Sequence, residues 1–236
     1  MRFVKRAVST RRPPFSSFND TMTDKQTRDR IIRLIHKEVV PAIGCTEPMA
    51  VALCTARATE ALGQTPETID AYLSANILKN AMGVGIPGTG MIGLPIAIAL
   101  GALIGKSSYE LEVLKDLTPD SLEQGKAYIN GKHIRIHLKE NITEKLYIEI
   151  VCHTADHESK AIISRSHTHF IFVATDGKTL LDKQPCEGQE ADDDDIQLSL
   201  RLVYDFATTA PADEIRFLLE TKEYNMKAAR EAIKGN

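Results

Sequence analysis

The hydrophobic pattern of this chain changes its period near Gly131. Upstream of this point, apolar residues such as Ile31, Ile35 and Val39 recur at helical spacing. Downstream, short runs alternate apolar and polar residues, and turn-like clusters such as Asp176-Gly177 separate them. The sequence therefore predicts an α+β fold, in which a helical module precedes an antiparallel meander of about five strands and a pair of C-terminal helices.

Four segments follow from this pattern. They are a basic, disordered leader at 1–21, a helical module with a glycine-rich loop at 22–130, the β-meander at 131–187, and an acidic linker with C-terminal helices at 188–236. Inside the helical module, helices are predicted at about 46–62 and 119–130, with a strand at 67–75 between them. Gly63 is the expected C-cap of the first of these helices.

The leader, MRFVKRAVSTRRPPFSSFNDT, has several basic residues and a single acidic one, Asp20. Such a composition is typical of an organellar transit peptide. The alternative is a disordered tail or an upstream start, since a normal helical sequence begins at Met22. We favour the tail, because no apolar segment with a small-residue cleavage site follows, and we therefore expect a cytoplasmic protein.

Composition excludes several classes of partner. The net charge is −3 and the pI is about 6.2, so no basic surface for nucleic acid is expected. The longest apolar run, residues 91–105, is shorter than the roughly 20 residues of a membrane span, so it predicts a buried helix. The four cysteines form no C-x-x-C pair, which favours reduced thiols, and Cys54 is expected to pack in the core.

The stretch LKNAMGVGIPGTGMIGLP, residues 78–95, is the richest in glycine. Gly83-x-Gly85-x-x-Gly88 matches a dinucleotide-binding fingerprint, but this motif requires a buried strand before it and a helix after it. Lys79 and Asn80 do not suit such a strand, and Pro87 lies inside the loop. The dinucleotide interpretation is therefore rejected.

A flexible glycine loop can instead bring backbone N–H groups close to an anion such as a carboxylate. Polar side chains of the kind that orient an amino acid lie in or near it. The predicted substrate-binding residues here are Asn76, Lys79, Asn80, Gly88, Thr89 and Gly90. The alternative is a packing loop that lets two helices approach closely.

The second unusual stretch is VVPAIGCTEPMAVAL, in which Cys45 precedes an apolar helix. Thr46 is expected to cap this helix, and Pro48 is tolerated in its first turn. The free N–H groups and the dipole at a helix start favour a thiolate, so Cys45 is a candidate base or nucleophile. Thr46 and Glu47 beside it are candidate substrate contacts. The alternative is that Cys45 is a small buried residue that packs beside Gly44.

Other candidate motifs carry less weight. Gly101 and Gly105, followed by Lys106-Ser107, resemble a Walker A motif, but one residue is missing and the motif follows a helix. His133 and His137 fall four apart on the same face of a predicted strand, where solvent-side residues are more typical than metal ligands. Cys152-His153 with His157, and His167 with His169, could suggest a metal site. They lie in strands or at strand ends without thiolate or carboxylate partners at ligand spacing, so no metal site is predicted.

Five blocks together resemble the L-cysteine desulfidases, a bacterial and archaeal family related to the alpha chain of iron–sulfur L-serine dehydratases. The blocks are PAIGCTEP, SANILKNAMGVGIPGTGMIGLPIAIALGAL, LEVLKD, SHTHFIF and IRFLLE, which span roughly residues 25–230. The first two are long and specific.

The resemblance implies a carbon–sulfur lyase that converts L-cysteine to sulfide, pyruvate and ammonia. It implies a [4Fe-4S] cluster with an open iron site and no pyridoxal phosphate, and it makes the cysteine of the GCTEP block, Cys45, the proton acceptor. A thiolate at a helix start suits this role, because abstraction of an α-proton needs a base poised near neutral pH.

The cysteines that bind the cluster in that family belong to a C-terminal half that this sequence lacks. Cys54, Cys152 and Cys186 do not lie in matching blocks. A cluster with an open site needs at least three thiolates, so we predict that this chain alone binds none and is inactive until a C-terminal half is supplied. Surface left uncovered by that half predicts self-association, as a homo-oligomer.

Two alternatives to the desulfidase remain open. One is a non-catalytic module that binds an amino acid without turning it over. The other is an L-serine dehydratase, because serine and cysteine differ only in the leaving atom.

Overall fold

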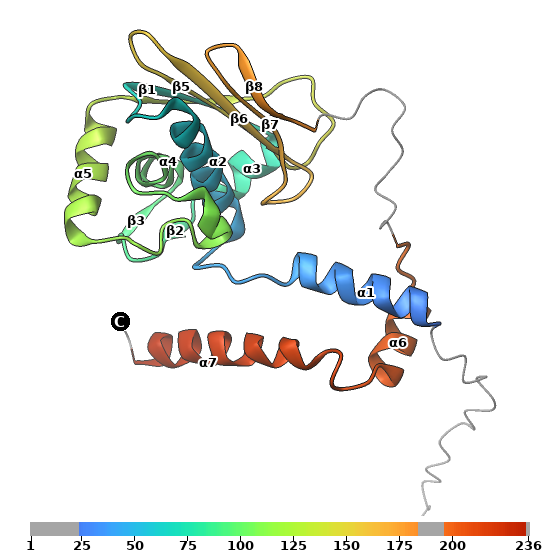
Figure 1. Cartoon of the computed structure of the whole chain (residues 1–236). Coiled ribbons are helices and arrows are strands. Elements are labelled where there is room, and N and C mark those ends of the chain that lie inside the picture. The colour runs from blue at the N-terminus through green and yellow to red at the C-terminus, as the bar shows by residue number, and fades with distance from the viewer. Residues whose placement is uncertain (1–23, 184–195, 235–236) are drawn as a thin grey trace, which may run out of the picture. The chain divides into compact units, whose positions relative to one another are not determined.

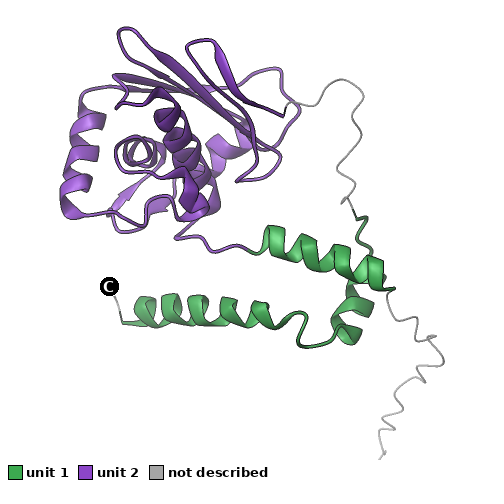
Figure 2. Ribbon diagram, in the orientation of Figure 1, with its two compact units in different colours: residues 1–39, 191–236 green, residues 40–190 purple. Residues whose placement is uncertain are grey.

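The computed structural model describes residues 24–183 and 196–234. The basic leader, Cys186 and the acidic run at 192–195 lie outside the described residues. The chain divides into two compact units, one made of residues 1–39 and 191–236 and the other of residues 40–190 (Figure 2). The expected boundary between residues 130 and 131 lies inside the second unit.

The second unit is built on a six-stranded sheet (Figure 1). Its strand order is β4-β1-β5-β6-β7-β8, and a separate two-stranded ribbon pairs β2 with β3. The strands of the large sheet are β1 (Thr68–Leu73), β4 (Ile134–Leu138), β5 (Tyr147–His153), β6 (Glu158–Ser164), β7 (Phe170–Thr175) and β8 (Lys178–Asp182).

The α+β class is confirmed, but one strand pairing differs from the predicted meander. Strands β5 to β8 pair antiparallel with their neighbours in sequence, whereas β4 pairs in parallel with β1. Parallel neighbours need a long crossover. Here it consists of helices α3 (Ala75–Ala81), α4 (Leu94–Leu103) and α5 (Pro119–Asn130), with the β2–β3 ribbon and the 3-10 helix η1 (Ser107–Glu112) between them. Strand β1 therefore separates β4 from the four-stranded meander.

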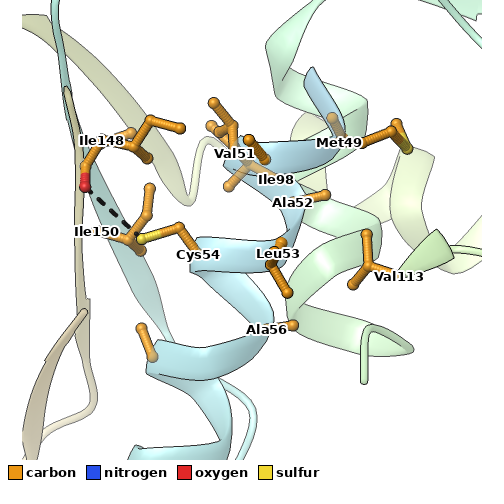
Figure 3. Close-up of a cluster of buried hydrophobic side chains, with 14 of the residues drawn as sticks. Met49, Val51, Ala52, Leu53, Cys54, Ala56, Ile98, Val113, Ile148 and Ile150 are labelled. Carbon is orange, nitrogen blue, oxygen red and sulfur yellow. Dashed lines mark hydrogen bonds between the residues drawn. The ribbon is translucent and has the colours of Figure 1, made fainter. Parts of the chain in front are cut away.

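Helix α2 (Thr46–Leu62) occupies the centre of this unit. It packs against β5, β6 and β7 on one side and against α4 on another, so it is buried nearly all round. Cys54 points from α2 towards β5, and its Sγ lies 3.8 Å from the Ile148 carbonyl oxygen (Figure 3). The predicted packing role of Cys54 is confirmed, because its side chain is buried. The helix ends, as predicted, at Gly63, which has a left-handed φ of 78°.

Helices α2 and α4 approach each other closely at Gly101. A Cβ atom at this position would lie 2.6 Å from the Ala52 carbonyl oxygen of α2. The resemblance to a Walker A motif therefore reflects helix packing, since Gly101 is in the last turn of α4. None of the described helices is long and apolar enough to cross a membrane.

Two carboxylates on the sheet have buried side chains. They alternate with the apolar residues that face α2 and α4, so they lie on the opposite face of the sheet. Asp70 receives hydrogen bonds from Arg135 Nε at 2.8 Å and from His137 Nε2 at 2.9 Å. His137, predicted to be a solvent-side residue, thus also contacts a buried partner.

The second carboxylate, Glu149, receives hydrogen bonds from Lys139 Nζ at 2.6 Å and from the Tyr147 hydroxyl at 2.9 Å. Lys160 Nζ lies 3.1 Å from its other oxygen. Burial acts to raise the pKa of Glu149, but these hydrogen bonds and charges outweigh it and lower the pKa. The pKa of Asp70 is lowered by the same balance, in which Arg135 and His137 outweigh burial.

We expect the free energy of unfolding to fall as the pH is lowered from 7 to 3. A carboxyl group with a depressed pKa in the folded state stabilises the fold above its unfolded pKa, about 4.3 for Glu, and this contribution disappears as the pH falls through the folded pKa. Glu149→Gln should cost about 1.5–3 kcal/mol at pH 7 and much less at pH 3. Urea unfolding at both pH values tests this, with the exposed Glu140→Gln as control. An equal cost of Glu149→Gln at both pH values would contradict it.

The first unit contains α1 (Lys25–Glu38), α6 (Leu200–Thr209), the 3-10 helix η2 (Arg216–Leu218) and α7 (Leu219–Ile233). Arg28 Nε lies 2.9 Å from Glu214 Oε2, and the His36 ring stacks on Phe217. The two predicted C-terminal helices correspond to α6 and α7. The N-cap of α6 is Ser199, whose hydroxyl accepts a hydrogen bond from the Leu202 N–H at 3.1 Å.

Candidate functional site

Cys45 is the N-cap of α2, and Thr46 is the first residue of the helix. The expectation that Thr46 caps the helix is therefore wrong by one position. The Cys45 side chain makes no capping hydrogen bond, and it is an exposed free thiol. Its sulfur thus lies at the helix end where backbone N–H groups lack partners inside the helix.

The segment before α2 contacts the glycine-rich loop. A Cβ atom at Gly44 would lie 2.6 Å from Pro87 Cγ, so a larger residue here would force Pro87 to shift. Pro87 belongs to the turn of the ribbon formed by β2 (Gly85–Ile86) and β3 (Met91–Ile92). The structure therefore places Cys45 one residue from a direct contact with the glycine hairpin.

The hairpin turn explains several of the glycines. Gly88 and Gly90 have φ values of 75° and 63°, which favour glycine, and both are exposed. Thr89 between them is buried: its hydroxyl donates to the Ile86 carbonyl at 2.7 Å and accepts from the Met91 N–H at 2.9 Å. Thr89, a predicted substrate contact, therefore stabilises the turn, and the two glycines present the turn's exposed backbone. The segment that matches the dinucleotide-binding fingerprint therefore follows helix α3 and runs into a β-hairpin.

Glu47 joins the start of α2 to α3. Its Oε1 accepts a hydrogen bond from Asn80 Nδ2 at 3.2 Å, and its Oε2 accepts from the Thr46 hydroxyl at 3.3 Å. Burial acts to raise the pKa of Glu47, but hydrogen bonds from its own N–H, Asn80 and Thr46, with the charge of His167, lower the pKa overall. Glu47 is therefore an anion at neutral pH.

The remaining predicted substrate residues lie on α3. Asn76 and Lys79 are exposed, and Asn76 lies one turn before Asn80 on the same side of the helix. The structure thus brings together Cys45, Glu47 and Asn80, and it leaves Asn76 and Lys79 at the surface of the adjoining helix.

Sequence reasoning did not assign His167 to this site. It lies in the turn between β6 and β7, and it is among the groups that lower the pKa of Glu47, after Asn80. The available signal is the block SHTHFIF, which contains His167 and belongs to the resemblance described above. The neighbouring His169 has its Nδ1 3.2 Å from the Ser164 carbonyl oxygen.

The described thiols do not fit an iron–sulfur cluster. Within residues 24–183 and 196–234, no group of three or more His, Cys, Asp or Glu residues could hold a metal ion. Cys54 and Cys152 are buried in the core, and burial raises the pKa of Cys152 to about 12. His153 and His157 contact carboxylates: His153 lies near Asp70 and Glu158, and His157 near Asp176.

Comparison with known proteins finds relatives called UPF0597 proteins. The one from Phocaeicola vulgatus is 63% identical over 215 residues, which are 91% of this chain and 50% of the relative. The one from Bacteroides thetaiotaomicron is 61% identical over 209 residues, 89% of this chain and 49% of the relative. A more distant one, from Aeromonas hydrophila, is 39% identical over 207 residues. The chain spans about half the length of these relatives.

No family model matches the chain. No solved structure matches it either. The name of the relatives states no reaction.

Proposed function

We propose that this chain binds a small amino acid at the start of α2 and supplies the proton acceptor of an L-cysteine desulfidase. The observation that carries the proposal is the position of Cys45, an exposed thiol at a helix N-terminus beside the glycine hairpin. An exposed thiol can be reached by a substrate, and the thiolate is the form of a cysteine that can accept a proton. The resemblance of the GCTEP block to that family agrees with this role.

Two neighbours of Cys45 suit the two charges of an amino acid. Glu47 is an anion held in place by Asn80 and Thr46, and it is suited to bind the α-ammonium group. The exposed turn at Gly88 and Gly90 lets backbone N–H groups approach the carboxylate. The α-carbon of an amino acid carries both the ammonium and the carboxylate group, so a substrate bound through these two groups has its α-carbon fixed in position. A base beside it can then remove the α-proton.

The part of this chain in the reaction is a proton transfer. The Cys45 thiolate takes the proton from the α-carbon of L-cysteine, and the electron pair of that C–H bond forms the Cα–Cβ double bond as the sulfur leaves with its bonding pair. The product 2-aminoacrylate tautomerises to the imine, and water converts the imine to pyruvate and ammonia. The described residues offer no ligand set for the cluster that the resemblance implies, so its ligands would come from a second half. A thiol base also suits the cytoplasm, where thiols stay reduced.

Glu47→Gln is expected to weaken amino-acid binding at least 10-fold. The change keeps the shape and the hydrogen bond to Asn80 but removes the charge that pairs with the ammonium group, worth about 1.5–3 kcal/mol. Chemical-shift titration of the full chain with L-serine and with S-methyl-L-cysteine measures this. Glu144→Gln, a change of an exposed carboxylate, is the control. Equal affinity in the Glu47 variant would remove the assigned role.

One assay separates the desulfidase from its alternatives. The chain is combined anaerobically with the half of the Bacteroides thetaiotaomicron relative that the match to this chain does not cover, called the uncovered half below. Release of sulfide from L-cysteine and of pyruvate from L-serine is then measured. We expect sulfide from the pair and none from the chain alone. Binding without turnover by the pair would favour a non-catalytic module, and faster pyruvate release from L-serine would favour a dehydratase.

A further inference from the structure

The C-terminal helices carry a concentration of exposed apolar side chains. In the described part of the first unit, Ile31 and Phe206 are the buried apolar residues. More than half of the large exposed apolar residues of the described chain lie between 198 and 233. They are Leu198, Leu200, Val203, Tyr204, Leu219, Tyr224, Met226 and Ile233.

Helix α6 has a broad apolar face that is only partly buried. Phe206 is buried inside the unit, and Val203, three residues before it, continues the apolar surface to Leu200 and Tyr204, which are exposed. The exposed fractions on this face are 92% for Leu200 and 65% for Tyr204. An apolar face that continues past its buried part leaves surface on which a further element can pack.

Helix α7 presents a narrow apolar stripe. Leu219, Met226 and Ile233 follow one another at intervals of seven residues, and none of the residues of α7 is buried. This interval keeps the three side chains on one side of the helix, and it supplies one of the two apolar positions per seven residues by which two helices pack. The groove along α7 that contains Leu219 and Met226 has a basic border. Its basic residues are Lys222, Lys227, Arg230 and Lys234, and its acidic residues are Glu223 and Glu231.

The relatives indicate what covers this surface. They are about twice the length of the part that this chain spans. The match to the Phocaeicola vulgatus protein includes 91% of this chain, and what is left unmatched is too short to contain the whole segment from 196 to 234. At least part of the exposed helical surface therefore lies in the region that matches the relatives. Each of these relatives has a further segment, about as long as the matched one, that could cover this surface.

We propose that the exposed faces of α6 and α7 are the docking surface for the half of the relatives that this chain does not span. The segment that docks is an amphipathic helix, with an apolar stripe to pack against Leu219, Met226 and Ile233 and with acidic residues that face the basic border of α7. This inference goes beyond the proposed function, because docking through α6 and α7 does not depend on the chemistry of Cys45.

Binding of the two polypeptides tests the proposal without any substrate. The full chain is mixed with the uncovered half of the Bacteroides thetaiotaomicron relative, coexpressed if that half needs its partner for solubility. Light scattering after gel filtration gives the stoichiometry and calorimetry gives the affinity. We expect a 1:1 complex that Leu219→Lys with Met226→Lys weakens at least 10-fold, and that Ile233→Lys alone weakens as well. Because these side chains are exposed, circular dichroism should be unchanged in the variants.

Matched controls lie in the second unit. Leu138 and Leu180 are exposed to a similar degree as Met226, so Leu138→Lys and Leu180→Lys should leave the affinity unchanged. Absence of a complex would overturn the proposal, as would a complex that the α7 changes leave intact. A homodimer of this chain that the same α7 changes dissociate would also overturn it, since a second copy would then occupy the surface. Failure of Glu47→Gln to alter amino-acid binding bears on the proposed function alone.

Discussion

Cys45→Ala is expected to lower sulfide release from L-cysteine by roughly 10²–10⁴-fold in the enzyme reconstituted from this chain and the uncovered half of a relative. The sulfur of Cys45 is the proposed proton acceptor, and alanine leaves no group that can replace it. The fold should tolerate the change, because Cys45 is exposed and its side chain makes no capping hydrogen bond. Initial rates of sulfide release, measured under saturating L-cysteine, give the factor.

Cys45→Ser is the matched control for this change. Serine is a favoured N-cap residue, so the variant should be as stable as the parent chain or up to about 1 kcal/mol more stable. Its hydroxyl is a poor base near neutral pH, so activity should still be lost. Rates in either variant close to that of the parent chain would show that Cys45 does not take the proton.

Gly101→Val is expected to destabilise the second unit by about 3 kcal/mol. The added Cβ would lie 2.6 Å from the Ala52 carbonyl oxygen and 3.0 Å from its Cα. These are backbone atoms inside α2, so they cannot move aside as a side chain could, and the two helices would have to separate. Such a separation opens gaps in a core that is otherwise closely packed. Chemical denaturation followed by far-UV circular dichroism measures the loss.

Gly83→Ala provides the control for the Gly101 change. A Cβ atom at Gly83 would meet nothing within 4 Å. The variant should differ from the parent by less than about 0.5 kcal/mol. Equal stability of the Gly101 and Gly83 variants would mean that the close approach of α2 and α4 is not a feature of the folded protein.

Helix ends were predicted well where a residue type marks them. The bounds of α2 and α5 agree with the prediction, because Gly63 adopts the left-handed conformation of a C-cap and Pro119 lies in the first turn of α5. Helix α3 was not predicted. It has only seven residues, too few for a helical period to stand out next to the glycine-rich loop.

The pairing of β4 could not be predicted from its pattern. Alternation indicates which residues of a strand face the core, but it does not indicate which strand lies beside it. The partner of β4 is β1, which precedes it by a long helical crossover, and antiparallel pairing with the next strand is equally compatible with alternation.

The candidate site was predicted in part. Cys45, Glu47 and Asn80 come from two segments of unusual composition, and the structure places these segments in contact. His167 was missed, because a histidine in a strand turn carries no signal of its own and only the fold places it near Glu47. The hydroxyl of Thr89 was assigned to a substrate, although local hydrogen bonds in the turn use it.

The most direct test of the account is protection of Cys45 from alkylation in the chain alone. Iodoacetamide modification of this thiol is followed by mass spectrometry with and without S-methyl-L-cysteine, whose sulfur does not compete for the reagent. If the amino acid binds beside Cys45, alkylation slows as the ligand approaches saturation, and the D-enantiomer has a smaller effect. An alkylation rate that saturating L-ligand does not change would contradict the claim that Cys45 and the glycine hairpin form one binding site.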